Sequence, residues 1–243
     1  MMNERRMRIL ARLAVPAGKE LQTRQLCEAA AEVVGLTGAG IMLMSGDMPV
    51  GSACTTNEVS ALVERLQYDM GEGPCIDAYQ HNRPVLEPNL AAPATPRWLA
   101  FTPPAVDAGV RAIFGFPLRV GGVHLGALNL YRDEIGALTD EQHADALVMA
   151  DLAAQALLVM QAHAPPDQLA IELEEGGDFP YVVHQASGMV AAQLDVGVGQ
   201  ALIRLRAYAF ANKRTVPDVA KAVVARTLRF DDLDDSSPGQ SDV

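Results

Sequence analysis

The sequence has few of the residues that mark several common classes of protein. Its only cysteines are Cys27, Cys54 and Cys75, none of them in a CxxC pair, which argues against a disulfide framework and against a zinc site. We therefore expect three reduced thiols. No apolar run approaches the roughly 18 to 20 residues that span a bilayer, and no apolar stretch follows the arginines near the N-terminus. We expect a cytoplasmic protein that contacts no membrane.

Sequence patterns for catalysis are also missing. The five histidines are scattered, without HExxH or HxH spacing, and no glycine-rich loop has the form of a P-loop. Cys75 follows the loop GEGP at the start of a predicted helix, where a thiolate has a lowered pKa. This makes Cys75 a candidate redox or nitrosyl sensor; the alternative is a small residue packed in a loop. We expect a protein that is not an enzyme.

Charge is present but unevenly distributed. The net charge of −11 argues against a nucleic acid bound over the whole surface. Residues 181–230, however, carry a net charge of +5 and lie between the acidic segments 165–180 and 231–243, of −5 each. Because local potential decides whether a polyanion is attracted, the basic segment is the candidate for nucleic-acid binding. The last segment, 231–243, is expected to be a disordered acidic tail.

Apolar periodicity over residues 18–163 predicts alternating helices and short strands. Strands are expected at 38–46, 50–56, 84–87, 110–120 and 124–132. Helices are expected at 20–34, 57–70, 76–80 and 138–163, and a Thr139–Gln142 capping box opens the last of these. The glycines at 121 and 122 predict a hairpin. This order is typical of an α+β domain, an antiparallel sheet with helices on one side, preceded by an N-terminal extension, 1–17.

The rest of the chain has a different pattern. After an acidic linker, 164–180, three apolar stripes with helical spacing predict helices at 182–194, 198–212 and 216–228. We therefore expect an all-α three-helix bundle over 181–230. Its core is so small that we expect it to gain apolar contacts by pairing, in a homodimer.

The first domain resembles a known sensor family. The strings that carry the resemblance are GEGPCIDAYQHNRPVLEPNL (71–90), FPLRVGGVHLGALNLYR (116–132) and LTDEQHADALVMADLAAQAL (138–157). They are similar to those of GAF domains common in actinobacterial regulators. The resemblance implies a sensor fold whose sheet and loops enclose a pocket for a small-molecule effector. It leaves the identity of the ligand unknown, because one fold serves many functions.

The bundle resembles the ANTAR domain, a three-helix RNA-binding output module of transcription antiterminators. The matching strings are HQASGMV (184–190), QALIRLRAYAFANKR (200–214) and VPDVAKAVV (216–224). The resemblance implies that RNA stem-loops are bound through Ala186, Gly188, Arg206, Ala209, Asn212, Lys213 and Arg214. Ser187 is a departure, since many members have Lys there, and it removes one phosphate contact.

Physical chemistry supports this reading of the bundle and leaves alternatives open. Arg206 can pair with a phosphate or a base edge through two hydrogen bonds, and Gly188 suggests a close approach of another backbone. Arg204 is expected to be solvated, and Tyr208 to lie in the core. The sequence thus indicates a signal-responsive RNA-binding regulator of antitermination. The alternatives are a protein-interaction adaptor that binds no RNA and, more weakly, a helix-turn-helix DNA binder.

Overall fold

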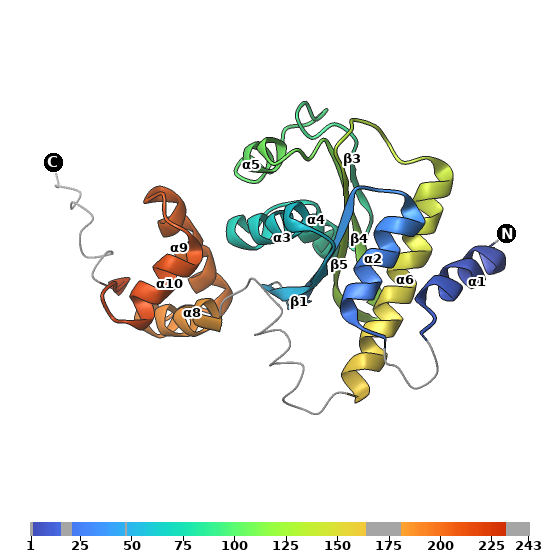
Figure 1. The fold of residues 1–243 in the computed structure, drawn as a ribbon. Coiled ribbons are helices and arrows are strands. Elements are labelled where there is room, and N and C mark those ends of the chain that lie inside the picture. Colours follow the sequence, from blue (N-terminus) through green and yellow to red (C-terminus); the bar gives the residue numbers. More distant parts are fainter. Residues whose placement is uncertain (1, 16–20, 47, 164–180, 232–243) are drawn as a thin grey trace. The chain divides into compact units, whose positions relative to one another are not determined.

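A computed structural model of the 243-residue chain describes residues 2–15, 21–46, 48–163 and 181–231 (Figure 1). The chain divides into two compact units, Met1–Phe179 and Pro180–Val243. The first is called the sensor unit and the second the helical unit. The expected linker at 164–180 and all but the first residue of the expected tail lie outside the described residues.

The sensor unit is built on one five-stranded antiparallel sheet, in the order β2-β1-β5-β4-β3. Its strands are β1 (Gly38–Ser45), β2 (Met48–Thr55), β3 (Val85–Glu87), β4 (Ala112–Val120) and β5 (Val123–Arg132). β4 and β5 form the expected hairpin, in which Val120 pairs with Val123. The edge strand β2 starts earlier than expected, and its register with β1 shifts at two points.

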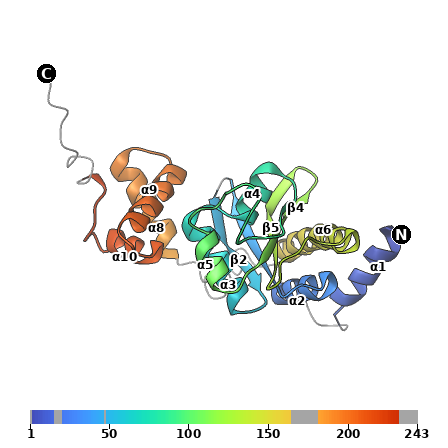
Figure 2. The same ribbon diagram turned by 90° about the horizontal axis from the view of Figure 1, so that it is seen from above.

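Helices cover both faces of this sheet (Figures 1 and 2). One layer holds α1 (Met2–Leu13), α2 (Thr23–Val34) and α6 (Asp140–His163), and the other α3 (Glu58–Met70), α4 (Pro74–His81) and α5 (Thr102–Asp107). The expectation of helices on one side only was therefore wrong. The reason is that β1 buries seven consecutive residues, so both of its faces need an apolar cover.

Helix α1 gives structure to what we expected to be a plain N-terminal extension. Its apolar residues Ile9 and Leu13 are buried in the core that includes α2 and α6. Arg5 and Arg8 both bind the carboxylate of Asp145 on α6, with N–O distances of 2.6 and 2.7 Å. The helix is thus attached to the sensor unit by apolar burial and by a shared carboxylate.

Helix α6 begins with the expected capping box. The Gln142 backbone nitrogen donates to Thr139 Oγ1, and the Thr139 backbone nitrogen donates to Gln142 Oε1, both at 3.1 Å. Among the described residues, α6 is the one helix long and apolar enough to cross a membrane by length and composition. However, Met149, Ala153 and Leu157 are buried in the core, a position typical of a core helix.

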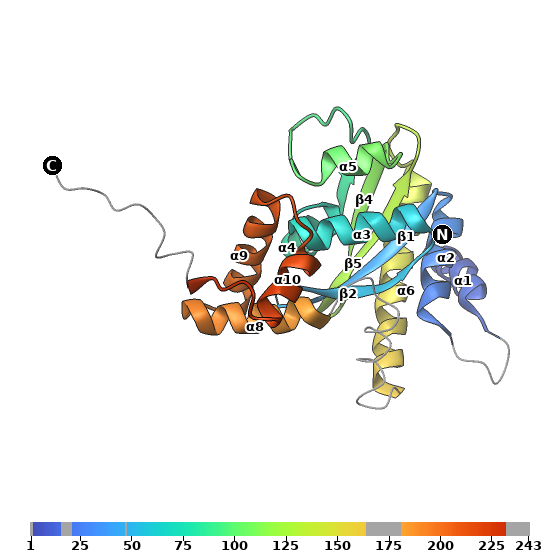
Figure 3. The same cartoon turned by 60° about the vertical axis from the view of Figure 1, so that its left-hand side comes forward.

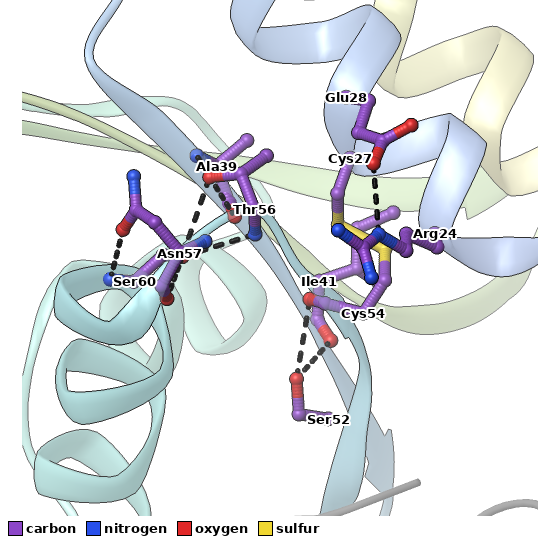
Figure 4. Close-up of a disulfide and its surroundings, with 10 residues drawn as sticks. All are labelled: Arg24, Cys27, Glu28, Ala39, Ile41, Ser52, Cys54, Thr56, Asn57 and Ser60. Carbon is purple, nitrogen blue, oxygen red and sulfur yellow. Dashed lines mark hydrogen bonds and ion pairs between the residues drawn. A yellow bond between two sulfur atoms is a disulfide. The ribbon is translucent and has the colours of Figure 1, made fainter.

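Two of the three cysteines form a disulfide, which corrects the expectation of three reduced thiols. Cys27 on α2 is bonded to Cys54 on β2, with their Cα atoms 6.0 Å apart (Figure 4). The two residues are 27 positions apart in the sequence. They meet because α2 packs across the sheet beside its edge strand, a relationship that cysteine spacing alone does not reveal.

The helical unit consists of three described helices: α8 (Tyr181–Leu194), α9 (Val198–Ala211) and α10 (Val216–Val224) (Figure 3). Their buried residues are mostly Ala, Val and Leu, including Val183, Leu205 and Val219. α10 ends four residues earlier than expected, because Arg226 takes a left-handed backbone conformation with φ 58°. The expected three-helix arrangement is present.

Candidate sensor site and nucleic-acid interface

Cys75 lies near the N-terminus of α4, as expected, but in surroundings that suppress thiolate formation. It is fully buried, and its backbone nitrogen donates to Gln67 Oε1 at 2.7 Å. Burial raises the pKa of the Cys75 thiol well above its usual value, and the nearby Glu64 raises it further. The lowered pKa expected at a helix N-terminus is therefore wrong. A buried neutral thiol is a poor nucleophile.

Cys75 instead belongs to a buried polar cluster between the sheet and its α3–α4 cover. The cluster consists of Glu64 and Gln67 from α3, Asn129 from β5 and Cys75. Gln67 Nε2 is buried without a hydrogen-bond partner, and the buried Glu64 carboxyl and Asn129 amide have only each other. Since buried polar groups are normally satisfied, such a cluster is suited to an ordered water or a polar ligand.

The ionisation of Glu64 follows from its position. Burial raises the pKa of Glu64 to about 8, while the Asn129 side chain acts in the opposite direction. The carboxyl group is therefore mostly protonated at neutral pH. Gly40 on β1 makes this position available, because a Cβ atom there would lie 2.7 Å from Glu64 Oε1. The cluster was not anticipated, although an asparagine within the apolar run of β5 was a signal that could have found it.

A separate open cleft of about 600 Å³ lies beside the edge strand β3. Its lining residues come from β3 and the loop that follows, namely Leu86, Glu87, Pro88, Asn89, Ala92, Ala94, Thr95 and Arg97. Arg97 lies 3.5 Å from Glu87 and stacks on Trp98, with its guanidinium carbon 4.3 Å from the ring centroid. The cleft contains no residue of the buried polar cluster. No group of His, Cys, Asp or Glu within the described ranges is suited to hold a metal ion.

The structure separates the expected RNA-binding residues of the helical unit into two sets. Ala186 and Ala209 are buried in the bundle core, so they support packing and cannot contact RNA. Ser187 is buried too, and its hydroxyl donates to the Val183 carbonyl at 2.8 Å. Position 187 therefore does not lie on the surface where a phosphate would bind. Gly188 is exposed, and a Cβ atom there would meet no atom of this chain within 4 Å, so its own bundle does not require a glycine at this position.

The remaining residues lie on α9 and the turn that follows. Arg206 is half-buried, while Asn212, Lys213 and Arg214 are exposed. The turn is held by two hydrogen bonds, one from Asn212 Nδ2 to the Tyr208 carbonyl at 2.8 Å and one from Arg214 to the Asp218 carbonyl at 2.9 Å. The three exposed residues are thus held in one basic turn.

Sequence reasoning missed Phe210, which is 69% exposed. Ile203, Arg206 and Phe210 follow one another at intervals of three or four residues, which places them on one side of α9. We call these three residues the α9 face. Tyr208, the aromatic residue that we assigned to the core, is half-buried and packs on Phe230 with ring centroids 5.4 Å apart. The signal for Phe210 was its place outside the apolar stripe of α9.

Comparisons with known proteins concern the sensor unit. The GAF domain family model matches residues 23–158, more than half of the chain. The search of curated proteins found no match.

Among solved structures, the chain resembles three GAF domains of bacterial proteins. The GAF domain from a phosphoenolpyruvate-protein phosphotransferase of Coxiella burnetii has 15% identity and a TM-score of 0.49, covering 66% of this chain and 95% of that one. The GAF domain region of a putative membrane protein from Geobacter sulfurreducens has 14% identity and a TM-score of 0.47, covering 65% and 98%. The second GAF domain of DevS from Mycobacterium smegmatis has 17% identity and a TM-score of 0.43, covering 58% and 93%.

The family match agrees with the strands, the hairpin and the long closing helix of the sensor unit, and it confirms the resemblance of residues 71–90 and 116–157. It ends at residue 158, before the helical unit begins. A GAF domain has a role in small-molecule sensing or signalling. The chain belongs to the GAF domain family.

Proposed function

We propose that this chain is a cytoplasmic, signal-responsive regulator of transcription antitermination whose helical unit binds RNA stem-loops. The observation that carries the proposal is the α9 face, where the exposed Phe210 lies one helical turn from Arg206. RNA loops are recognised by basic contacts to the backbone and by bases that stack on aromatic rings or guanidinium planes. The α9 face combines both kinds of group. The proposal assigns the chain no catalytic step.

Local charge supports the same function. The segment 181–230 has a net charge of +5 in a chain whose net charge is −11. Lys213 and Arg214 add two exposed cations three and four residues after Phe210. Because each phosphate neutralised by a protein releases counterions, binding by this surface should weaken steeply with salt.

A protein-interaction adaptor is the second candidate, and one observation favours it. Ile203 on the α9 face is 62% exposed, and together with Phe210 it forms an apolar surface that a partner helix could cover. Apolar docking of this kind depends little on salt. The salt dependence of binding therefore separates the two candidates.

For the sensor unit, we propose that a small-molecule effector provides the signal. Two features support this: the buried polar cluster around Glu64, which includes the unpaired Gln67 Nε2, and the cleft beside β3. Homodimerisation is also part of the proposal. It is supported by Leu147 and Val159, which α6 leaves exposed, and sedimentation velocity of the full chain tests it.

The test of RNA binding uses the full-length protein and short fluorescent stem-loop RNAs at several salt concentrations. Wild type should bind at low salt, and its affinity should fall steeply as salt rises. Arg206→Ala should weaken binding and lower the salt slope by about one unit. Arg204→Ala is the matched control, since it removes the same charge from α9 outside the α9 face and should leave the affinity almost unchanged.

Two outcomes would contradict the proposal. One is the absence of stem-loop binding by the folded wild-type protein at low salt. The other is an equal loss of affinity in the two arginine variants, which would indicate non-specific attraction to the bundle.

A further inference from the structure

The disulfide joins the helical layer of the sensor unit to the edge of its sheet. Strand β2 is an edge strand that pairs only with β1, and this pairing is interrupted by two register shifts. Cys54 of β2 is bonded to Cys27 of α2 (Figure 4). A covalent bond at this point therefore holds a strand whose main-chain pairing is irregular.

Helix α2 is in turn connected to the rest of its layer. Gln142 Nε2 of α6 donates to the Val34 carbonyl at the end of α2, at 2.9 Å. Arg12 of α1 pairs with Glu32 of α2 at 2.6 Å. A change in how α2 is attached to β2 therefore reaches α1 and α6 through direct contacts.

We propose that Cys27 and Cys54 form a reversible redox site, which thiol reductants open and which closes again on oxidation. In the cytoplasm, disulfides are usually transient or redox-sensing rather than structural, and this step rests on the cytoplasmic location proposed above. The state of this site sets how firmly α2 is held to β2. The chain thereby receives a redox signal in addition to its small-molecule signal.

The two cysteines differ in their access to solvent. Cys54 is 9% exposed on the edge strand, whereas Cys27 is fully buried, so exchange should begin at Cys54. Arg24 lies one turn before Cys27 on α2, where it pairs with Glu28 at 2.8 Å and keeps 73% of its side chain exposed (Figure 4). Because Arg24 is paired with Glu28 and mostly exposed, we assign the route of exchange to the access of Cys54 and not to a stabilised Cys27 thiolate.

The reaction balances with two thiols as reductant. A first thiolate attacks Sγ of Cys54, forming a mixed disulfide, and the S–S bond breaks with Cys27 leaving as a thiolate. A second thiolate attacks the reductant's sulfur in this mixed disulfide and releases Cys54 as a thiolate. Both protein thiolates take up protons. The protein gains two electrons and two protons, and the reductant is oxidised to its disulfide.

The reduced state can remain folded, which a reversible site requires. Cys27 and Cys54 both belong to the apolar core cluster that contains α2, α6 and one face of the sheet. A free thiol in such a place packs as a small apolar group. Reduction should therefore loosen α2 and β2 while the rest of the sensor unit keeps its fold.

The test equilibrates the full-length protein with glutathione at graded ratios of reduced to oxidised form. Alkylation followed by mass spectrometry then identifies the free thiols. Cys27 and Cys54 should become modified together in one two-electron transition, and they should return to the disulfide when oxidised glutathione is restored. Cys75, which lies outside the disulfide, is the internal control, and its modification should be the same at every glutathione ratio.

Hydrogen exchange measured on the same samples tests the consequence for the structure. Reduction should speed exchange at least about tenfold in 23–34 and 48–55, while the helices at 58–81 change little. The wild-type protein is measured in both its oxidised and its reduced state, so the result does not depend on whether a variant folds.

Three results would overturn the proposal. They are a disulfide that persists in fully reduced glutathione, thiols that stay free in fully oxidised glutathione, and hydrogen-exchange rates that are the same in both redox states. None of these readouts involves RNA, so failure of the redox site and failure of RNA binding are distinguishable.

Discussion

The sensor unit and the helical unit place their polar and apolar groups in opposite ways. The sensor unit has a large core with Phe114, Phe116 and Leu128 fully buried, and inside it lie the buried carboxyl of Glu64 and amide of Asn129. The helical unit has a small core, and it leaves Ile203 and Phe210 on its surface. In the first unit, the unusual groups are buried polar ones; in the second, they are exposed apolar ones.

This difference shows where each unit can carry a functional group. A large apolar core contributes enough stability to tolerate buried polar groups without partners, each of which costs about 1–3 kcal/mol. A three-helix unit has little stability to lose, but an exposed aromatic ring costs it little. These two energy balances favour a binding site in the interior of the sensor unit and a binding surface on the exterior of the helical unit.

The largest effect is expected from a mutation that opens a cavity in the small core of the helical unit. Leu205→Ala removes a fully buried side chain from α9 and should cost about 2–5 kcal/mol, enough to unfold so small a unit. Hydrogen exchange should then show loss of protection in α8–α10 but not in β4 and β5. Loss of protection in both units at once would show that they do not fold independently.

Next in size is the effect of the buried acid. The pKa of Glu64 is about 8 when folded and about 4.5 in a model peptide. The contribution of Glu64 to the free energy of unfolding is therefore greatest below about pH 4.5. It falls as the pH rises to about 8, by up to about 1.4 kcal/mol per pH unit. Glu64→Gln should abolish this dependence and stabilise the sensor unit at pH 8 by a few kcal/mol.

The measurement for Glu64 is denaturant unfolding of wild type and variant at pH 5, 6, 7 and 8. Parallel stability curves for the two proteins would show that Glu64 ionises normally. Lys221→Gln, a charge change on the exposed surface of α10, controls for general effects of charge on stability.

A smaller effect is expected from the disulfide. Replacing both Cys27 and Cys54 by Ala should lower the free energy of unfolding of the sensor unit by about 2–4 kcal/mol, chiefly because the unfolded chain is no longer cross-linked. The unfolding transition of the helical unit should not shift. If the free energy of unfolding of the sensor unit in oxidising buffer is the same for wild type and variant, the bond contributes nothing to its stability.

The smallest effect concerns the surface. Phe210→Leu keeps an apolar side chain on the α9 face but removes the ring, so it should weaken RNA binding by about 1–3 kcal/mol if bases stack there. Thermal stability should change little, since Phe210 is 69% exposed and contributes little buried area to the core. Equal RNA affinity for wild type and Phe210→Leu, measured by fluorescence anisotropy, would favour a surface for docking a protein partner.

Local patterns in the sequence predicted much of the fold. The β4–β5 hairpin, the capping box at Thr139 and the three helices of the second unit follow from turn residues and apolar spacing, which act over a few positions. Contacts between distant segments could not be predicted in this way. The pairing of Cys27 with Cys54, the attachment of α1 to Asp145 and the second helical layer all depend on packing across the sheet.

The candidate sites show the same limit. The exposure of Asn212, Lys213 and Arg214 follows from their place in a turn between two helices. The burial of Ala186 and Ala209 could have been inferred, since small apolar residues on helices most often face a core. Glu64 is harder, because a glutamate on an amphipathic helix usually faces solvent and only the apposition of Asn129 and Gly40 reveals that it does not.

The disulfide also has a mechanical consequence. Cys27 and Cys54 close a covalent ring that contains β1, so a force applied through the chain ends bypasses this strand. In single-molecule stretching, the sensor unit should unravel around the ring in oxidising buffer. With the bond open, the 27-residue separation should add about 90 Å of contour length. The length of the unfolded molecule would thus report the state of one bond.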